Sequence, residues 1–129
     1  MDCPETPYLR EAGYAERYRD QRFRTGTGVG THRREVRALQ ALLAALPADA
    51  DTTAPWLDVP AGAGRLTGLL PASASAVQAD RNLSMLKAAG PGHRRICASA
   101  QLLPFADRSF AGVLCMRLLH HVPGAEERI

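Results

Sequence analysis

Two carboxylates and a pair of glycines stand where a parallel sheet could hold a nucleotide-like ligand. Asp58 lies in a predicted strand, Trp56–Val59, which Gly62 and Gly64 follow closely. Asp80 closes the next predicted strand, 18 positions after Gly62. Ligands of open parallel sheets sit beyond the carboxyl ends of the strands, where glycine allows the backbone to approach closely. An acid at this distance accepts hydrogen bonds from ribose hydroxyls, and a helix-capping role is the alternative for Asp80.

The spacing of the glycines bears on which nucleotide the loop could hold. A dinucleotide fingerprint has a third glycine three positions after the second glycine of its opening pair. Thr67 occupies that position, and Pro60 stands before the pair. Neither residue suits a pyrophosphate group, so an NAD-dependent reductase is a minor alternative.

The elements around this loop alternate between strand and helix. Four apolar segments are predicted strands, at residues 56–59, 75–79, 94–98 and 111–116. Helices are predicted over residues 65–70, over residues 83–89 and from Gly124 to Ile129. The second of these is expected to have Asn82 as its cap, with Ser84 as the competing choice. Such alternation predicts an α/β fold with a Rossmann-like, doubly wound parallel sheet. Because the chain stops as the last helix begins, we expect an incomplete sheet of about four strands, the fourth covered on both faces.

The region before the first strand is predicted to be helical. Tyr14, Tyr18 and Phe23 are spaced for one side of a helix, and a longer helix is expected from His32 to Leu46 after a Thr31 cap. One apolar stripe of that longer helix comprises Val36, Leu39, Leu42, Leu43 and Leu46. Glycines at positions 26, 28 and 30 have no strand before them, so we interpret them as a flexible link. We therefore expect a helical, Arg-rich cap segment over residues 1–47 and a cofactor-binding domain over residues 48–129.

Composition and charge narrow the class of protein. The chain has 129 residues, 46% hydrophobic and 22% charged, with a net charge of +3, which is typical of a globular domain. It has no apolar run long enough for a transmembrane segment and no signal-peptide pattern at its start, so we expect a cytoplasmic protein. The cysteines form no CxxC pair, and no metal site is indicated. The excess of arginine before the first strand could contact RNA or an anionic membrane surface, but interleaved acids favour a solvated, salt-bridged helical face.

Four segments in order resemble the motifs of class I S-adenosylmethionine-dependent methyltransferases of the type 11-like group. Val59–Thr67 resembles the glycine motif of the subgroup with proline at the first glycine, and Asp80–Leu86 resembles the acid after the second strand with its helix. Leu103–Phe110 matches a Leu-Pro-Phe-x-Asp-x-Ser-Phe signature, and Leu118–Val122 matches the segment after the fourth strand. The ordered matches cover residues 56–122 and imply a methyltransferase acting on an unidentified acceptor.

The resemblance also implies which residues contact S-adenosylmethionine: Asp58, Pro60, Ala61, Gly62, Gly64, Arg65, Asp80, Arg81, Ser99, Ala100 and Arg117. The glycine loop would lie under the methionine part, and Asp58 would help to hold its amino group. Asp80 would bind both ribose hydroxyls, and Arg81 would flank the adenine. Ser99 stands where the family has an adenine-binding Asp, and Arg117 would face the region of methyl transfer.

Two departures from the family pattern leave a second hypothesis open. The acid at the start of the fourth strand is replaced by Ala111, and the fifth to seventh strands of the family are not in the sequence. The alternative is therefore a truncated, catalytically inactive cofactor-binding fragment. No catalytic side chain is assigned, and the adjacent His120 and His121 are interpreted as packing or acceptor-pocket residues rather than metal ligands, with a general-base role as the lesser alternative. A small molecule or a lipid is the expected acceptor, nucleic acid is a further candidate, and the oligomeric state is undetermined.

Overall fold

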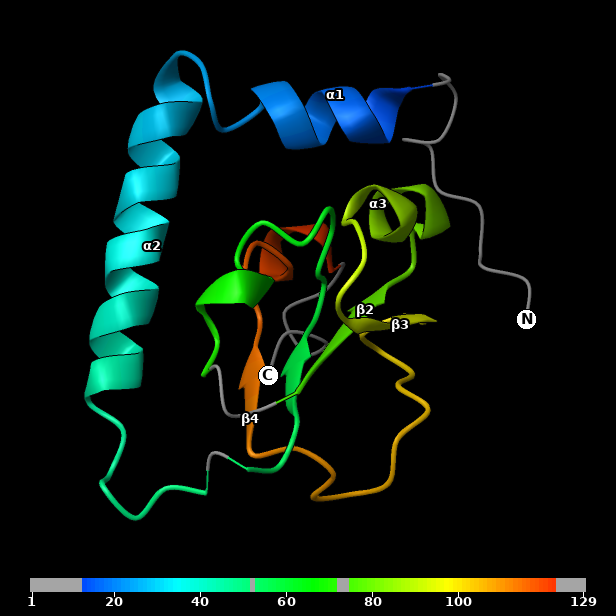
Figure 1. The fold of residues 1–129 in the computed structure, drawn as a ribbon. Coiled ribbons are helices and arrows are strands. Elements are labelled where there is room, and N and C mark those ends of the chain that lie inside the picture. The colour runs from blue at the N-terminus through cyan, green and yellow to red at the C-terminus, as the bar shows by residue number, and fades with distance from the viewer. Residues whose placement is uncertain (1–12, 52, 72–74, 123–129) are drawn as a thin grey trace.

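A four-stranded parallel sheet forms the centre of the structure (Figure 1). The computed structural model describes residues 13–51, 53–71 and 75–122. The strands are β1 (Trp56–Asp58), β2 (Ala76–Asp80), β3 (Arg94–Cys97) and β4 (Gly112–Leu114). The helices are α1 (Tyr14–Gln21), α2 (Thr27–Ala44), α3 (Leu83–Ala88) and the short 3₁₀ helices η2 (Thr67–Leu69) and η3 (Leu119–His121). The predicted helix from Gly124 to Ile129 lies outside the described residues.

The strand order confirms the predicted Rossmann-like sheet. The order is β3-β2-β1-β4, with every neighbouring pair parallel. This order matches the start of the 3-2-1-4-5-6 arrangement, whose direction of winding reverses between the first and fourth strands. Ligands of such sheets bind beyond the carboxyl ends of the strands at that reversal, so the fold directs attention to the ends of β1 and β4.

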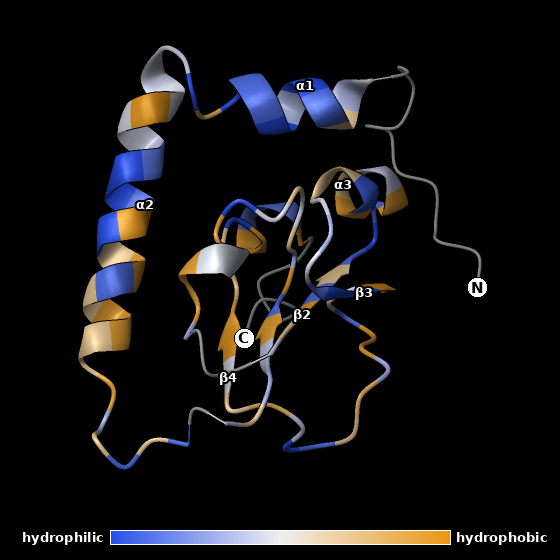
Figure 2. Cartoon of the chain, viewed as in Figure 1, coloured by the Kyte–Doolittle hydropathy of each residue, from blue (hydrophilic) through white to orange (hydrophobic). Residues whose placement is uncertain are grey.

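Alternate residues of the central strands pack on opposite faces of the sheet. On one face, Trp56 of β1 belongs to a cluster with Leu39 of α2. On the other face, Leu57 and Val77 pack with Phe105 from the chain between β3 and β4. Every residue of β1 and β2 is buried, as expected for parallel strands covered on both faces. Figure 2 shows that α1 is largely hydrophilic, whereas β4 is largely hydrophobic.

Gly112 lets β4 pair with β1 beside a large side chain. Trp56 and Gly112 are partners in the register of the two strands. A Cβ atom added at Gly112 would lie 2.4 Å from the indole ring of Trp56. Packing therefore requires glycine at this position.

The long helix α2 begins earlier than predicted. It starts at Thr27 rather than His32, so the interpretation of the glycine run as a flexible link was wrong. Thr31 does not cap the helix, because its hydroxyl donates to the Thr27 carbonyl one turn earlier, at 3.3 Å. Gly28 is needed where α2 crosses the end of the α1 segment, since an added Cβ atom would lie 2.0 Å from the Arg22 carbonyl oxygen.

The apolar stripe of α2 is narrower than the sequence indicates. Val36, Leu39 and Leu43 pack toward the sheet. Leu42 is 69% exposed, because the residue before Leu43 is turned about 100° away from it around the helix axis. Leu46 lies beyond the end of α2 and is also exposed. Among the described residues, no helix combines the length and the apolar character needed to cross a bilayer.

Two further predictions need correction, and one is confirmed. The helix expected over residues 65–70 is reduced to the three-residue η2, because buried polar contacts hold Thr67, as described below. The fourth strand is shorter than predicted and is not covered on both faces, since Val113 is 56% exposed at the edge of the described sheet. The Asn82 cap of α3 is confirmed, because its side chain accepts a hydrogen bond from the Met85 amide at 3.1 Å.

The two helical glycines of α2 give a matched test of this packing. We expect Gly28→Ala to lower the free energy of unfolding by about 2–3 kcal/mol, because the methyl group would overlap the Arg22 carbonyl. Gly30→Ala should raise it by about 0.5–1 kcal/mol, because open space surrounds that position and alanine favours the helix. Urea unfolding of both variants measures the difference. Equal effects of the two substitutions would contradict the close crossing at Gly28.

Candidate functional site

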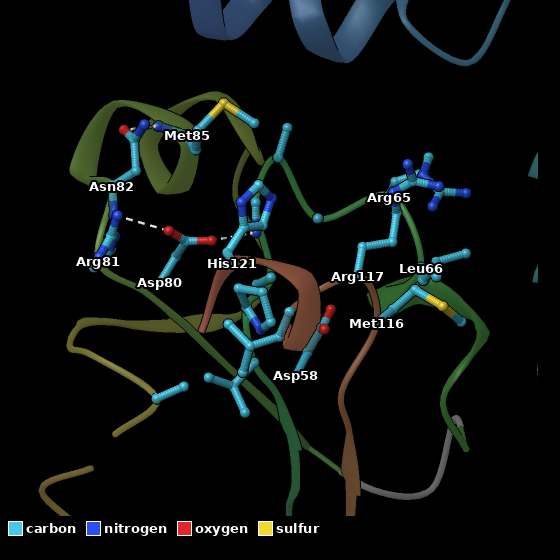
Figure 3. Close-up of a pocket in the computed structure, with 18 of the residues that line it drawn as sticks. Asp58, Arg65, Leu66, Asp80, Arg81, Asn82, Met85, Met116, Arg117 and His121 are labelled. Carbon is cyan, nitrogen blue, oxygen red and sulfur yellow. Dashed lines mark hydrogen bonds between the residues drawn. The ribbon is translucent and has the colours of Figure 1, made fainter. Parts of the chain in front are cut away.

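A pocket of about 720 Å³ opens over the carboxyl ends of the strands. Its size falls within the range of roughly 300–1,000 Å³ that is usual for small-molecule sites. All the residues that the sequence places at a cofactor line this pocket: Asp58, Pro60, Ala61, Gly62, Gly64, Arg65, Asp80, Arg81, Ser99, Ala100 and Arg117. Figure 3 shows Asp80 and Arg81 together on one side of it and Arg65 and Arg117 together on the other.

The glycine loop is shaped by its contacts with the sheet and with α3. The Val59–Pro60 peptide bond that opens the loop is cis. Gly62 and Gly64 both have positive φ, at 55° and 74°, a conformation that favours glycine. A Cβ atom at Gly64 would also lie 2.6 Å from the amide nitrogen of Gln78. Gly64 is therefore required by its packing against Gln78, whereas a Cβ atom at Gly62 would make only an ordinary contact, 3.6 Å from Met85.

Asp80 joins three elements at the pocket wall. One carboxylate oxygen accepts the backbone N–H of Gly62 at 2.8 Å, and the other accepts the N–H of Asn82 at 2.8 Å. The capping alternative for Asp80 does not hold, because Asn82 is the N-cap of α3. Burial raises the pKa of Asp80 above its usual value, against the lowering effect of the hydrogen bonds from Asn82 and Gly62. This carboxylate fixes the position of the glycine loop relative to β2 and α3.

Asp58 ends β1 within a buried chain of polar groups. It is 3% exposed and accepts a hydrogen bond from the Thr67 hydroxyl, which accepts one from the Gln78 amide at 2.9 Å. Burial, with a smaller contribution from nearby Asp80, raises the pKa of Asp58 to about 6, although the hydrogen bond from Thr67 opposes both. Thr67 thus links Asp58 of β1 to Gln78 of β2 by hydrogen bonds. It stands at the position where a dinucleotide fingerprint has its third glycine.

Residues of the N-terminal cap segment also reach the pocket, but the sequence did not identify which of them do so. Phe23 and His32 line it, and Glu35 of α2 forms ion pairs with both Arg65 and Arg117. A glutamate in a charged helical stretch carries no local signal of such a role. Only the folded chain brings Glu35 next to arginines that follow it by 30 and 82 positions.

The adjacent histidines lie in η3 at the pocket wall. The rings of His120 and His121 are 3.9 Å apart between centroids, and both line the pocket. Burial and the neighbouring His120 lower the pKa of His121, which favours a neutral ring. In the part of the chain that the structure describes, no three His, Cys, Asp or Glu side chains are grouped to hold a metal ion.

The hydroxyl of Thr67 can be tested directly. Thr67→Val should lower the free energy of unfolding by about 1–3 kcal/mol, because it leaves the buried Gln78 amide and Asp58 carboxylate without this partner. The pKa of Asp58 should rise above about 6, because the opposing hydrogen bond is lost. Thr67→Ser keeps the hydroxyl and is the control. Chemical unfolding and NMR titration of the carboxyl carbon measure the two effects, and an unchanged pKa in the valine variant would contradict the assignment.

Comparison with known proteins identifies the family of the chain. A profile of the methyltransferase domain matches residues 57–128, more than half of the chain. No curated protein matches the chain. The matched region begins within β1 and includes the glycine loop, Asp80 and the pocket residues that follow β4. With its Rossmann-like strand order and this match, the chain belongs to the class I S-adenosylmethionine-dependent methyltransferase family.

Proposed function

We propose that this chain binds S-adenosylmethionine in the pocket and that the protein transfers the methyl group to an acceptor. The observation that carries the proposal is the convergence of Asp58, Asp80 and the glycine loop on one cavity at the reversal of the sheet. The two carboxylates and the glycine loop suit this cofactor, which carries a ribose diol, an amino group and a positively charged sulfonium. Two carboxylates favour such a ligand over the pyrophosphate of a dinucleotide.

Asp80 is suited to the ribose. Its two oxygens accept the backbone N–H groups of Gly62 and Asn82, and the Arg81 N–H also bonds this carboxylate. An ionised carboxylate has about four acceptor sites, so part of its capacity is left for ribose hydroxyls while the glycine loop stays in place. The pre-existing hydrogen bonds hold the carboxylate in one orientation, which lowers the cost of ordering it when a ligand binds.

Asp58 is suited to a cationic group. Its pKa of about 6 leaves it mostly ionised at neutral pH, and a buried carboxylate without a cation is costly. The amino group of the ligand, directly or through water, would offset part of this cost. Binding of a cation should therefore favour the ionised form of Asp58.

The adenine would lie toward the end of β3. Arg81, Ser99 and Ala100 line that part of the pocket wall. The Ser99 hydroxyl already accepts the Gln101 amide at 3.2 Å, so it offers a neutral hydrogen-bonding group where the family has a carboxylate. A neutral acceptor forms a weaker bond than a charged one, and we expect the adenine to contribute correspondingly less affinity.

When bound, S-adenosylmethionine supplies an electrophilic methyl group. The residues of this chain hold the reacting partners and exclude water, and positioning of this kind accounts for a large share of rate acceleration in bimolecular reactions. Residues 1–47 would act as a cap, because α1 and α2 contribute Tyr14, Tyr18 and His32 to the pocket, and residues 48–129 would form the cofactor-binding domain. The acceptor we propose is a small molecule or a lipid, in the cytoplasm.

Cofactor binding is tested by calorimetric titration of the chain with S-adenosylhomocysteine. We expect saturable binding that S-adenosylmethionine competes away and that NAD does not affect. The control ligand is NAD alone, which should give no heat of binding. An absence of binding at millimolar S-adenosylhomocysteine, with the chain folded by circular dichroism, would contradict the proposal.

Asp58→Asn separates binding from stability. The pKa of Asp58 is about 6, above its ordinary 3.8, so its contribution to stability is present below pH 4 and is lost as the pH rises through 6. We therefore expect the variant to be more stable than the wild type by about 1–3 kcal/mol at pH 7 and nearly equal at pH 4. Its affinity for S-adenosylhomocysteine at pH 7 should fall. Thermal unfolding and calorimetry at both pH values measure these effects.

The matched control is Asp107→Asn, because Asp107 is exposed and does not line the pocket. That variant should not change the affinity for S-adenosylhomocysteine. A wild-type affinity that does not rise between pH 5 and pH 7 would show that the ionised form of Asp58 does not hold the ligand.

A further inference from the structure

One carboxylate of α2 binds two arginines that follow different strands. Arg65 comes directly after the glycine loop of β1, and Arg117 comes shortly after β4. The Arg65 guanidinium donates to one oxygen of Glu35, and Arg117 donates to the other oxygen at 3.0 Å. The Glu35 side chain is 14% exposed. These ion pairs connect α2 to both strands at the reversal of the sheet.

The two arginines are also constrained by Phe23 and His32. The Arg65 guanidinium lies 3.9 Å from the centroid of the Phe23 ring, and the Arg117 guanidinium lies 5.8 Å from it. Arg65 donates a further hydrogen bond to Nδ1 of His32 at 2.7 Å. Cation–π contacts of this kind strengthen when the groups are removed from water, and Phe23 is buried. The arginines therefore share one aromatic surface and one carboxylate.

Two guanidinium groups this close together repel each other unless an anion lies between them. Glu35 is that anion. Although burial raises its pKa, the hydrogen bonds from Arg117 and Arg65 outweigh burial and hold the pKa below its usual value. Arg117 also has a positive φ of 62°, an uncommon conformation for a residue with a side chain.

We propose that Glu35 is a positioning residue of the pocket, which holds Arg65 and Arg117 in the wall between the ends of β1 and β4. Arg65 and Arg117 line the pocket, whereas Glu35 lies behind them and does not. The role of Glu35 in ligand retention rests on the proposed function, but its role in fixing the two arginines does not. It follows that removal of the Glu35 charge should loosen the pocket wall that Arg65 and Arg117 form, without a change in any lining residue.

The first experiment needs no ligand. In the wild type, NMR should show separate, slowly exchanging guanidinium signals for Arg65 and Arg117, assigned with Arg65→Lys. In Glu35→Gln these signals should average, because the charged acceptor is lost. The matched control is Glu16→Gln, which makes the same chemical change at an exposed position of α1 outside the pocket. Signals that remain separate in Glu35→Gln would overturn the proposal.

Fluorescence distinguishes positioning from a purely structural role. Trp56 is the only tryptophan, and it packs in one cluster with Leu39, one turn after Glu35 on α2. We expect the emission maximum of Trp56 to be unchanged in Glu35→Gln, because the apolar contacts keep α2 on the sheet. A red shift of the Trp56 emission in Glu35→Gln, but not in Glu16→Gln, would show that Glu35 holds α2 on the sheet. The positioning role would then be wrong.

The second experiment uses S-adenosylhomocysteine as the probe. We expect Glu35→Gln to bind it about tenfold more weakly than the wild type, and Glu16→Gln to bind it equally well. Equal affinity in Glu35→Gln, together with averaged arginine signals, would overturn the link between the arginines and ligand retention. If the wild type does not bind the probe, the proposed function fails, whereas the NMR comparison still decides whether Glu35 fixes the two arginines.

Discussion

The hydrogen bonds of Asp80 are the interaction on which the arrangement of the site depends. A single carboxylate at the end of β2 accepts the amides of Gly62 and Asn82, so the glycine loop and the start of α3 are fixed to the same strand end. Loops at strand ends otherwise have considerable conformational freedom. Here the loop is held before any ligand binds, and the pocket wall is correspondingly preorganised.

The acidic and the basic side chains of the central pocket lie on two different sides. Asp58 and Asp80 lie on the β1–β2 side, and burial raises the pKa of both. Arg65 and Arg117 lie on the side of α2, where Glu35 offsets part of their charge. A ligand with a positive centre and a polar diol would compensate the buried acids. Folding thus bears a desolvation cost at Asp58 that ligand binding can recover, which is common where sites are built for function rather than stability.

Local signals in the sequence predicted much of the fold and of the candidate site. The acid at a strand end, the glycines after it and the Asn82 cap are each recognised from near neighbours. The remaining pocket residues, such as Ser99 and Arg117, were expected from the family resemblance, and they line the same pocket. The start of α2 was not predicted, because the need for Gly28 arises from Arg22, across a turn of the folded chain. Glu35 was missed for the same reason. Its partners are 30 and 82 positions away, and no local pattern indicates such a contact.

The pairing of Trp56 with Gly112 has a consequence at the other end of the sheet. The indole ring occupies the space that a side chain at residue 112 would need, at the amino ends of β1 and β4. Asp58 and Leu114 pair two residues further along, about 7 Å away, where the pocket opens. A side chain at residue 112 would therefore push β4 away from β1 within two residues of the strand ends that border the pocket. The alignment of those ends thus depends on a glycine that lies outside the pocket lining.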